Sequence, residues 1–464
     1  MKKRVIIIFI LLIVISSAIL YYLFTSRPFR PNIVMILIDA LRKDHLRCYG
    51  YYRNTSPKID EFAEDAFQFQ NCISTCSWTS PSIASLFTSL YVSGHGLMTH
   101  SQKSTDILGL QFATLAEVLK KNGYTTSAFI ANRWIREEFN YHQGFDVFEQ
   151  VGGNLPRPSA AAVKEKVLAW LNNKPREPFF TYVHFMDVHG PYYPPYPYNT
   201  FFTSEEKREL TPQEYKKLRY LKVAGQTDLN FYINQYDGEI RYCDYHIGKI
   251  LQYLKDADLY DDSLIILTSD HGEAFFEHGA CDHGFTLYNE EIRVPLIIRF
   301  PTSFDFTINA SIKPQLIDIG VTILDLMGAA FPYEVDGLSL ISFGKKKGVV
   351  SPRKRIYSEE YMKGFPKVSM IERDMKYTYH ISQERIVEGY DLAKDDTERQ
   401  NLLKMDENVD SKGAIAKEIQ AWLLRNEDFR NLISTKRDQA EIDPHTLEQL
   451  KSLGYIQYEG KNDH

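Results

Sequence analysis

Short apolar runs alternate with amphipathic helical patterns, and this alternation limits the fold more than any other feature of the sequence. Strands that are covered on both faces read as continuous apolar runs, because helices pack on both sides of a parallel sheet. The sequence therefore predicts an α/β fold with a mostly parallel central sheet flanked by helices. The expected strands are residues 32–38, 125–131, 178–185, 264–268 and 294–300, and the expected helices include residues 57–67, 159–171 and 231–254.

The amino terminus has the pattern of a membrane segment. Lys2, Lys3 and Arg4 precede an uncharged, mostly apolar run over residues 5–24. A run of about 20 apolar residues is long enough to cross a bilayer as a helix. We expect residues 1–26 to form a signal anchor, which makes a single-pass membrane protein with its catalytic domain outside the cytoplasm. The alternative is a cleaved signal peptide, and the protein would then be secreted.

Composition limits the domain organisation and the partners. At 464 residues the chain is long enough for a large domain and a smaller one. The α/β pattern loosens near residue 345, so we expect a catalytic domain over residues 31–345 and a smaller α+β subdomain over residues 346–464. The net charge of −6 gives no basic footprint, which argues against nucleic-acid binding.

Acidic residues end two of the expected strands. Asp39 follows the run over residues 32–38, and Asp270 follows residues 264–268 and precedes His271. In open α/β sheets, ligands bind beyond the carboxyl ends of the strands. Two carboxylates and one imidazole suit a divalent metal ion, and the residues alone leave Mn²⁺, Zn²⁺, Mg²⁺ and Ca²⁺ open.

Thr79 is the candidate nucleophile. It lies in Ser77-Trp78-Thr79-Ser80-Pro81, on a turn that opens an apolar, helix-like run. A free hydroxyl is a weak nucleophile, and coordination to a metal ion would activate it. The alternative is that Thr79 or Ser80 only caps the helix that follows.

Several motifs in order resemble the sulfatase family. Three of them are the run over residues 32–39, the run over residues 81–88 with Gly94-His95-Gly96, and Thr268-Ser269-Asp270-His271-Gly272-Glu273. A fourth is His184-Phe185-Met186-Asp187-Val188-His189-Gly190-Pro191, and a fifth is Arg293-Val294-Pro295-Leu296-Ile297. The resemblance covers nearly all of the chain after Pro31, and it implies an alkaline-phosphatase-like fold with one divalent metal ion.

The resemblance also implies roles for individual residues. Asp39, Asp270 and His271 would be metal ligands, with Thr79 as the fourth. His189 would contact or protonate the leaving group, and His283 falls where sulfatases often carry a basic residue that faces the ester oxygens. His184 and Asn132 are further candidates for substrate binding.

The sequence departs from the sulfatase signature at its most characteristic positions. That signature is Cys or Ser, any residue, Pro, any residue, Arg, and its first residue is oxidised to formylglycine. Here Thr79 stands in the first position and Ile83 in the last, and Ala40 follows Asp39 where many sulfatases have a second aspartate. We therefore expect no formylglycine. A Thr nucleophile is similar to that of the phosphoethanolamine and phosphoglycerol transferases of the same superfamily.

These features favour a sulfatase-like, metal-dependent hydrolase of sulfate or phosphate esters with Thr79 as nucleophile. The expected substrates are sulfated or phosphorylated glycans or lipids. One alternative is a membrane-anchored transferase of the phosphoethanolamine or phosphoglycerol type. The other is a non-catalytic binding protein on a sulfatase scaffold, which the missing signature residues would explain.

Overall fold

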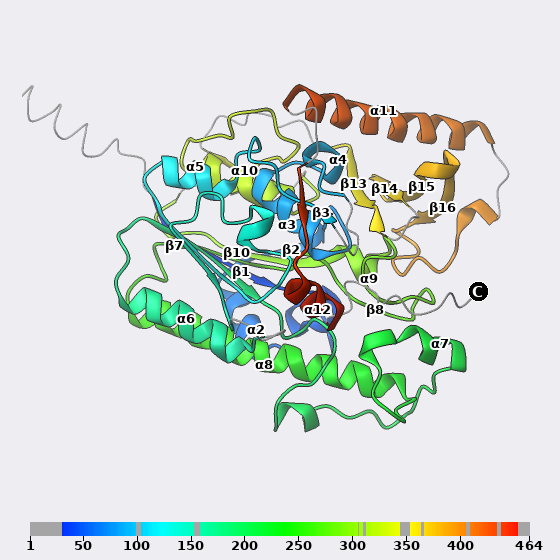
Figure 1. Cartoon of the computed structure of the whole chain (residues 1–464), viewed down its shortest axis with the longest axis horizontal. Coiled ribbons are helices and arrows are strands. Elements are labelled where there is room, and N and C mark those ends of the chain that lie inside the picture. Colours follow the sequence, from blue (N-terminus) through cyan, green and yellow to red (C-terminus); the bar gives the residue numbers. More distant parts are fainter. Residues whose placement is uncertain are drawn as a thin grey trace, which may run out of the picture.

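A seven-stranded sheet forms the centre of the computed structural model of the chain (Figure 1). The structure describes residues 30–98, 104–152, 158–304, 306–309, 312–343, 353–362, 366–404, 409–433 and 438–452. The strand order is β2-β10-β7-β1-β6-β4-β5, in which β7, β1, β6, β4 and β5 run parallel. The parallel strands are β1 (Asn32–Ile38), β4 (Thr125–Ile130), β5 (Val147–Gln150), β6 (Phe179–Phe185) and β7 (Ser263–Thr268). The predicted α/β fold with a mostly parallel sheet is confirmed.

The register of the central strands brings their carboxyl ends to one edge of the sheet. Leu37 of β1 lies opposite His184 of β6 on one side and opposite Thr268 of β7 on the other. Side chains that follow these strands must therefore meet at this edge. Asp39 and Asp270 are two of them.

Helices cover both faces of the sheet (Figure 1). One face carries α2 (Pro57–Glu64), α6 (Ala160–Asn172) and α8 (Leu229–Asp256), and α8 packs against both of the others. The other face carries α3 (Thr79–Thr88), α5 (Leu115–Lys121) and α10 (Ile317–Leu326). Thr114 and Glu117 form a capping box at the start of α5. The inner strands β1, β6 and β7 are wholly buried between these layers, which explains their mostly apolar sequences.

Two features of the sheet differ from the sequence-based expectation. The expected helix over residues 57–67 ends at Glu64, and an unexpected strand, β2 (Phe67–Ile73), begins at Phe67. This edge strand alternates polar and apolar residues, unlike the buried strands. In addition, β10 (Arg293–Arg299) is antiparallel to both β7 and β2. Strand direction has no signature in an apolar run, so the sequence did not reveal it.

A second, four-stranded antiparallel sheet lies in the carboxyl-terminal part of the chain. Its strands are β13 (Arg355–Glu360), β14 (Lys367–Glu372), β15 (Met375–His380) and β16 (Arg385–Asp391), and α11 (Val409–Ile433) lies across it (Figure 1). Trp422 of α11 stacks on Tyr357 of β13 at 4.0 Å and meets the edge of Tyr91, which belongs to the first part of the chain, at 5.0 Å. An aromatic cluster thus joins this sheet to the segment between α3 and α4. The boundary predicted at residue 345 falls outside the described residues.

Shorter elements complete the fold. The helices are α4 (Val92–His95), α7 (Pro212–Lys217), α9 (Asn289–Ile292) and α12 (Pro444–Ser452). The strands are β3 (Ser104–Asp106), β8 (Ala274–Phe275), β9 (Cys281–Asp282), β11 (Phe306–Ile308), β12 (Ile341–Phe343) and β17 (Gln439–Glu441). Because β17 pairs with β3, the carboxyl-terminal end of the chain packs against its first third.

Within the described ranges, no helix combines the length and the apolar character needed to cross a bilayer. The anchor predicted over residues 1–26 lies outside those ranges and stays a prediction.

A buried ion pair ties the start of β13 to α10. Arg353 Nη1 and Nη2 donate to the two carboxylate oxygens of Asp318 at 2.7 and 2.6 Å, and 6% and 0% of the two side chains is exposed. Removing one partner of a buried pair leaves the other charge uncompensated. We expect Arg353→Met to lower the free energy of unfolding by about 3–5 kcal/mol, measured by urea denaturation.

Lys58→Met is the matched control, because Lys58 pairs with Glu61 at the surface and both side chains are 51% exposed. Its effect should stay within about 1 kcal/mol. Equal shifts in the two variants would contradict a structural role for the Arg353 pair.

Candidate metal centre and active site

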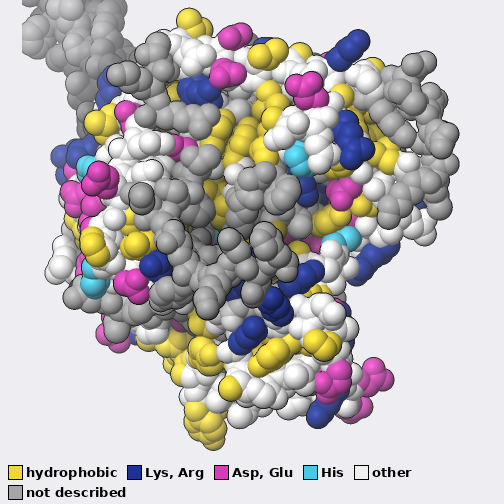
Figure 2. Space-filling view, turned by 45° about the vertical axis from the view of Figure 1, so that its right-hand side comes forward, with side chains coloured by type: hydrophobic (Ala, Val, Ile, Leu, Met, Phe, Trp, Pro, Cys, Tyr) yellow, Lys and Arg dark blue, Asp and Glu magenta, His cyan; other side chains and the backbone are white. Residues whose placement is uncertain are grey.

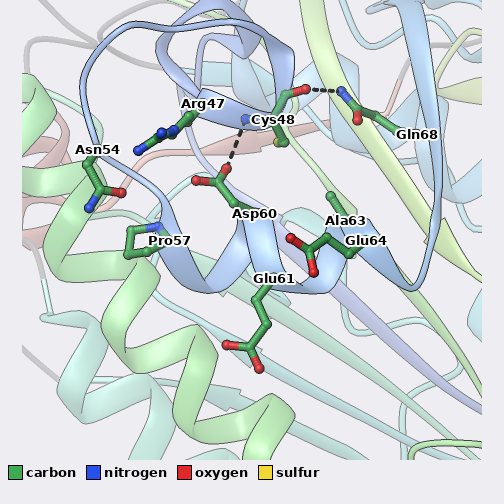
Figure 3. Close-up of a pocket in the computed structure, with 9 residues that line it drawn as sticks. All are labelled: Arg47, Cys48, Asn54, Pro57, Asp60, Glu61, Ala63, Glu64 and Gln68. Atoms are coloured by element: carbon green, nitrogen blue, oxygen red, sulfur yellow. Dashed lines mark hydrogen bonds between the residues drawn. The ribbon is translucent and has the colours of Figure 1, made fainter.

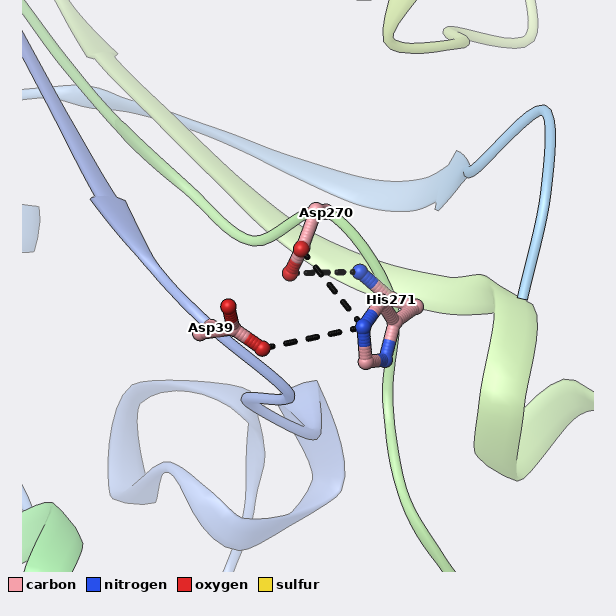
Figure 4. Close-up of side chains that lie close together, drawn as sticks. All are labelled: Asp39, Asp270 and His271. Carbon is pink, nitrogen blue, oxygen red and sulfur yellow. Dashed lines mark hydrogen bonds and ion pairs between the residues drawn. The ribbon is translucent and has the colours of Figure 1, made fainter. Parts of the chain in front are cut away.

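Three predicted ligands converge at the carboxyl edge of the large sheet (Figure 4). Asp39 follows β1, and Asp270 and His271 follow β7. All three side chains are fully buried, and one ligand atom from each lies within 4.8 Å of the others. His271 Nε2 is 3.6 Å from Asp39 Oδ1 and 3.5 Å from Asp270 Oδ2. This spacing leaves room for one ion between them.

The hydrogen bonds of the three residues fit a cation. A carbonyl oxygen only accepts, so the 2.8 Å contact to Gly272 O assigns the ring proton of His271 to Nδ1. Its Nε2 lone pair then faces the two carboxylates. Within the described part of the chain, Asp39 Oδ1 and Asp270 Oδ2 are buried and accept no hydrogen bond. Buried oxygens without a donor are costly, and a divalent metal ion would satisfy both.

The pKa shifts of the two carboxylates also favour a cation between them. Burial opposes ionisation of Asp39, but the hydrogen bond from His184 and the nearby imidazoles hold the pKa of Asp39 well below its usual range. Burial and the charge of Asp39 raise the pKa of Asp270. Two buried carboxylates repel each other, and a divalent cation between them removes that repulsion.

Backbone contacts fix the loop that carries Asp270. The amide of Ala40 donates to Asp270 Oδ1 at 3.2 Å, from a left-handed conformation with φ of 57°. The hydroxyls of Ser74 and Ser82 both donate to the carbonyl oxygen of Asp270, at 2.5 and 2.8 Å. Because Ser82 belongs to α3, the loop is tied to the helix that carries Thr79.

Thr79 is the first residue of α3, and its side chain faces the metal ligands. Its Oγ1 lies 3.2 Å from His271 Nε2 and 3.5 Å from Asp39 Oδ2. The residue in the cap position is Trp78, whose side chain makes no capping hydrogen bond. The hydroxyl of Thr79 is therefore directed at the predicted metal centre rather than at the helix terminus.

His184 and Asn132, expected to bind substrate, contact Asp39 in the structure. His184 Nε2 is 3.0 Å from Asp39 Oδ2 and its Nδ1 is 2.8 Å from the hydroxyl of Tyr182. Asn132 Nδ2 donates to the same Asp39 oxygen and lies 3.5 Å from Thr79 Oγ1. Both residues hold Asp39 so that its other oxygen faces Asp270 and His271.

His189 and His283 lie beside the metal ligands. The ring of His283 is 4.3 Å from that of His271 and 4.7 Å from that of His189. Burial lowers the pKa of His189 to about 3, and its Nδ1 donates to Gly190 O at 2.7 Å. Although burial opposes it, the carboxylates of Glu273 and Asp282 raise the pKa of His283 to about 10. At neutral pH His283 is therefore a protonated, charged imidazolium, and His189 is a neutral imidazole.

Two further residues of the site escaped the sequence analysis. Glu273 Oε1 and Asp282 Oδ1 lie 3.3 and 3.2 Å from His283 Nδ1. The three side chains could also hold a cation. However, the imidazole donates to the carboxylates here, whereas Asp39 Oδ1 and Asp270 Oδ2 lack a donor among the described residues. The sequence offered one sign of their role: each carboxylate lies within two residues of a histidine, in His271-Gly272-Glu273 and in Asp282-His283.

Ile83 occupies the position of the signature arginine and is completely buried in the main apolar core. Its side chain supplies no charge near Thr79. Ile83 lies four residues after Thr79 in α3, so an apolar side chain stands at the last position of the signature.

A recess lies elsewhere, between α2 and the turn before it (Figure 3). Its volume is about 590 Å³. Asp60, Glu61 and Glu64 line it, and Asp60 accepts a hydrogen bond from the amide of Cys48 at 2.9 Å. It contains none of the predicted site residues.

The chain matches two family descriptions. Residues 31–329 match the family model described as Sulfatase. Residues 276–425 match the model described as N-sulphoglucosamine sulphohydrolase, C-terminal. The first match alone covers more than half of the chain.

Individual relatives are distant in sequence but similar in fold. The chain is 22% identical to an N-acetylglucosamine-6-O-sulfatase of Bacteroides thetaiotaomicron, over 80% of this chain and 82% of the relative. A phosphonate monoester hydrolase of Silicibacter pomeroyi has a TM-score of 0.66 at 20% identity, over 86% of this chain and 96% of that one. A structure described as a complex with its substrate, D-glucosamine-2-N,6-O-disulfate, has a TM-score of 0.67 at 20% identity, over 88% and 100% of the two chains.

The geometry of the three ligands generates a metal-binding prediction. The full chain, saturated with Mn²⁺ or Zn²⁺ and then freed of excess metal, should retain about one ion per molecule by elemental mass spectrometry. Asp270→Asn should lose it, because the substitution removes a charged ligand oxygen with little change in volume.

Asp244→Asn is the matched control. Asp244 is also buried, but its oxygens accept from the amides of Lys58 and Ile59 at the start of α2. The control should retain the ion. A wild-type chain that stays free of metal under saturating conditions would contradict the assignment.

Proposed function

Because this chain belongs to the sulfatase family, we propose that it is a metal-dependent hydrolase of sulfate or phosphate esters with Thr79 as its nucleophile. One observation carries the proposal. The hydroxyl of Thr79 lies 3.2 Å from the unprotonated nitrogen of His271. Two buried carboxylate oxygens that lack a donor in the described chain, Asp39 Oδ1 and Asp270 Oδ2, lie 3.6 and 3.5 Å from the same nitrogen. A capping or packing threonine would have no reason to lie there.

The residues divide the first step among them. Asp39, Asp270 and His271 would hold the ion, with Thr79 as the fourth ligand. A divalent ion in this position would lower the pKa of the Thr79 hydroxyl and withdraw charge from the ester. Thr79 Oγ1 then gives up its proton to water and attacks sulfur or phosphorus, and the bond to the leaving-group oxygen breaks on the opposite side. The group is left esterified to Thr79.

The His189–His283 pair serves the leaving group. A departing alkoxide must take up a proton, and a positioned acid supplies it. His283 carries the proton at neutral pH because Glu273 and Asp282 raise its pKa to about 10. In our proposal, this proton reaches the leaving-group oxygen by way of His189, whose ring lies 4.7 Å from the ring of His283. The charge of His283 also favours the anionic ester.

Water completes the cycle by attacking the sulfur or phosphorus of the Thr79 adduct. This attack releases inorganic sulfate or phosphate and returns the hydroxyl to Thr79. A hydrolase is favoured over a transferase because the relatives that resemble this chain include sulfatases and a phosphonate monoester hydrolase. A non-catalytic role is disfavoured, since the ligands and the nucleophile face one another.

The proposed substrates are sulfated or phosphorylated glycans. The relative from Bacteroides thetaiotaomicron is a glucosamine sulfatase by name, and another structure of this fold holds a glucosamine disulfate. We also propose, from the basic residues and apolar run at the amino terminus alone, that residues 1–26 anchor the enzyme with its site outside the cytoplasm.

Thr79→Ala should abolish both turnover and the covalent intermediate. We expect kcat/KM on an aryl ester to fall at least about 1,000-fold, because no other hydroxyl can replace the nucleophile. Intact-protein mass spectrometry after acid quenching should show the adduct in the wild-type chain and not in the variant.

Thr88→Ala removes the same atoms from the same helix, where the Thr88 hydroxyl donates to the helix carbonyl of Ala84 at 2.7 Å. This control should keep turnover within about threefold, since a hydrogen bond inside a helix contributes little. Undiminished turnover in Thr79→Ala would exclude Thr79 as the nucleophile.

Side-by-side rates separate sulfate from phosphate chemistry. We expect kcat/KM for an aryl phosphodiester to exceed that for an aryl sulfate. A threonine adduct has only one oxygen on its β-carbon. It can therefore break down only by attack of water at the sulfur or phosphorus atom. Faster turnover of the sulfate would contradict this preference and favour sulfate as the natural ester.

A further inference from the structure

A basic segment of the chain projects beside the proposed active site. Between Glu214 and Asp228 the sequence contains four cations and no acidic residue. The segment comprises the end of α7 and the turn η5 (Arg219–Leu221), at the lower right of the molecule in Figure 1. Its cations are Lys216, Lys217, Arg219 and Lys222, and all four are exposed.

Two contacts place this segment at the rim of the site. The hydroxyl of Tyr220 donates to Asp282 Oδ1 at 2.9 Å, and the same oxygen lies 3.2 Å from His283 Nδ1. Leu221 packs so closely on Gly190, the residue after His189, that a Cβ added to this glycine would lie 2.2 Å from Leu221 Cδ2. The segment therefore adjoins both histidines that face the leaving group.

Three cations of the segment, Lys217, Arg219 and Lys222, make contacts with neutral groups. Lys217 Nζ donates to the carbonyl of Gly279 at 2.7 Å. The guanidinium of Arg219 lies 4.5 Å from the centre of the Phe285 ring, and Lys222 Nζ lies 5.4 Å from that of Tyr215. In the described chain, these three side chains form no ion pair with a carboxylate. Carbonyl and ring contacts fix their positions and leave their charge available to a ligand.

We propose that this basic segment binds further anionic groups of the substrate, so that the enzyme prefers a polyanionic glycan to an isolated ester. This inference rests on the proposed function, because it takes the reacting ester to lie between Thr79 and the two histidines. Lys and Arg side chains gather near the middle of the face in Figure 2, above its lower lobe. In a chain of net charge −6, a local group of cations also steers anions toward the site.

A membrane surface could also attract these cations. The contacts through Tyr220 and Leu221 favour the glycan, because they place the cations around the leaving-group side of the site instead of on a remote surface. A glycan chain that continues beyond the reacting ester would pass over them.

The test measures binding of heparin, a sulfated polysaccharide, to the full chain by titration calorimetry, with neutral dextran as the reference. The variant is the triple substitution Lys217→Gln, Arg219→Gln and Lys222→Gln. We expect heparin to bind about tenfold more weakly, with a smaller dependence of affinity on salt, because three cations no longer release counterions.

The control is the triple substitution Lys120→Gln, Lys166→Gln and Lys249→Gln. These exposed lysines lie on α5, α6 and α8, which lead into the amino ends of β4, β6 and β7 at the opposite edge of the sheet. The net charge changes equally, so heparin affinity should stay within about twofold if position matters more than total charge.

Three results would overturn the inference: unchanged heparin affinity in the segment variant, an equal loss in both triple variants, or an effect confined to binding of vesicles containing phosphatidylglycerol. The last would identify a membrane contact. Heparin binding requires no turnover, so it tests the segment even in a chain whose catalysis fails. Conversely, absence of the Thr79 adduct in the wild-type chain would refute the proposed function without changing the heparin result.

Discussion

The mutual repulsion of Asp39 and Asp270 is the constraint on which the rest of the site depends. Both carboxylates are fully buried at the edge of the sheet, and each directs toward the lone pair of His271 one oxygen that no described residue donates to. Such an arrangement is unfavourable without a cation, and the parallel register of β1 and β7 brings the residues together. The fold therefore places these side chains in a site that a divalent ion would stabilise. The surrounding residues hold this site in position.

Two layers of contacts keep that site in position. His184 and Asn132 hold one oxygen of Asp39, and Ser74 and Ser82 hold the carbonyl of Asp270. Because Ser82 and Thr79 share α3, the helix that carries the proposed nucleophile is fixed to the loop that carries Asp270, a candidate metal ligand. The leaving-group side has its own support, in which Glu273 and Asp282 hold His283 and Tyr220 holds Asp282. Through Tyr220 and Asp282, the basic segment is therefore connected to His283.

The sequence could predict the parts of this molecule that have a periodic or local signal. Continuous apolar runs identified the buried strands, and an acidic residue after a run identified Asp39 and Asp270, because strand ends in a parallel sheet share one edge. The antiparallel direction of β10 and the edge strand β2 had no such signal. His184 and Asn132 were recognised as site residues, but only the structure shows that they contact Asp39. The link from Tyr220 to His283 joins residues more than 60 positions apart, and no local pattern encodes it.

Anomalous diffraction from crystals grown with Mn²⁺ or Zn²⁺ would test the central claim most directly, since it locates the ion and the Thr79 side chain together. We predict one anomalous peak between Asp39, Asp270 and His271, with Thr79 Oγ1 at a coordination distance of about 2.0–2.2 Å. A peak among Glu273, Asp282 and His283 instead, or a Thr79 hydroxyl turned away from the ion, would contradict the account.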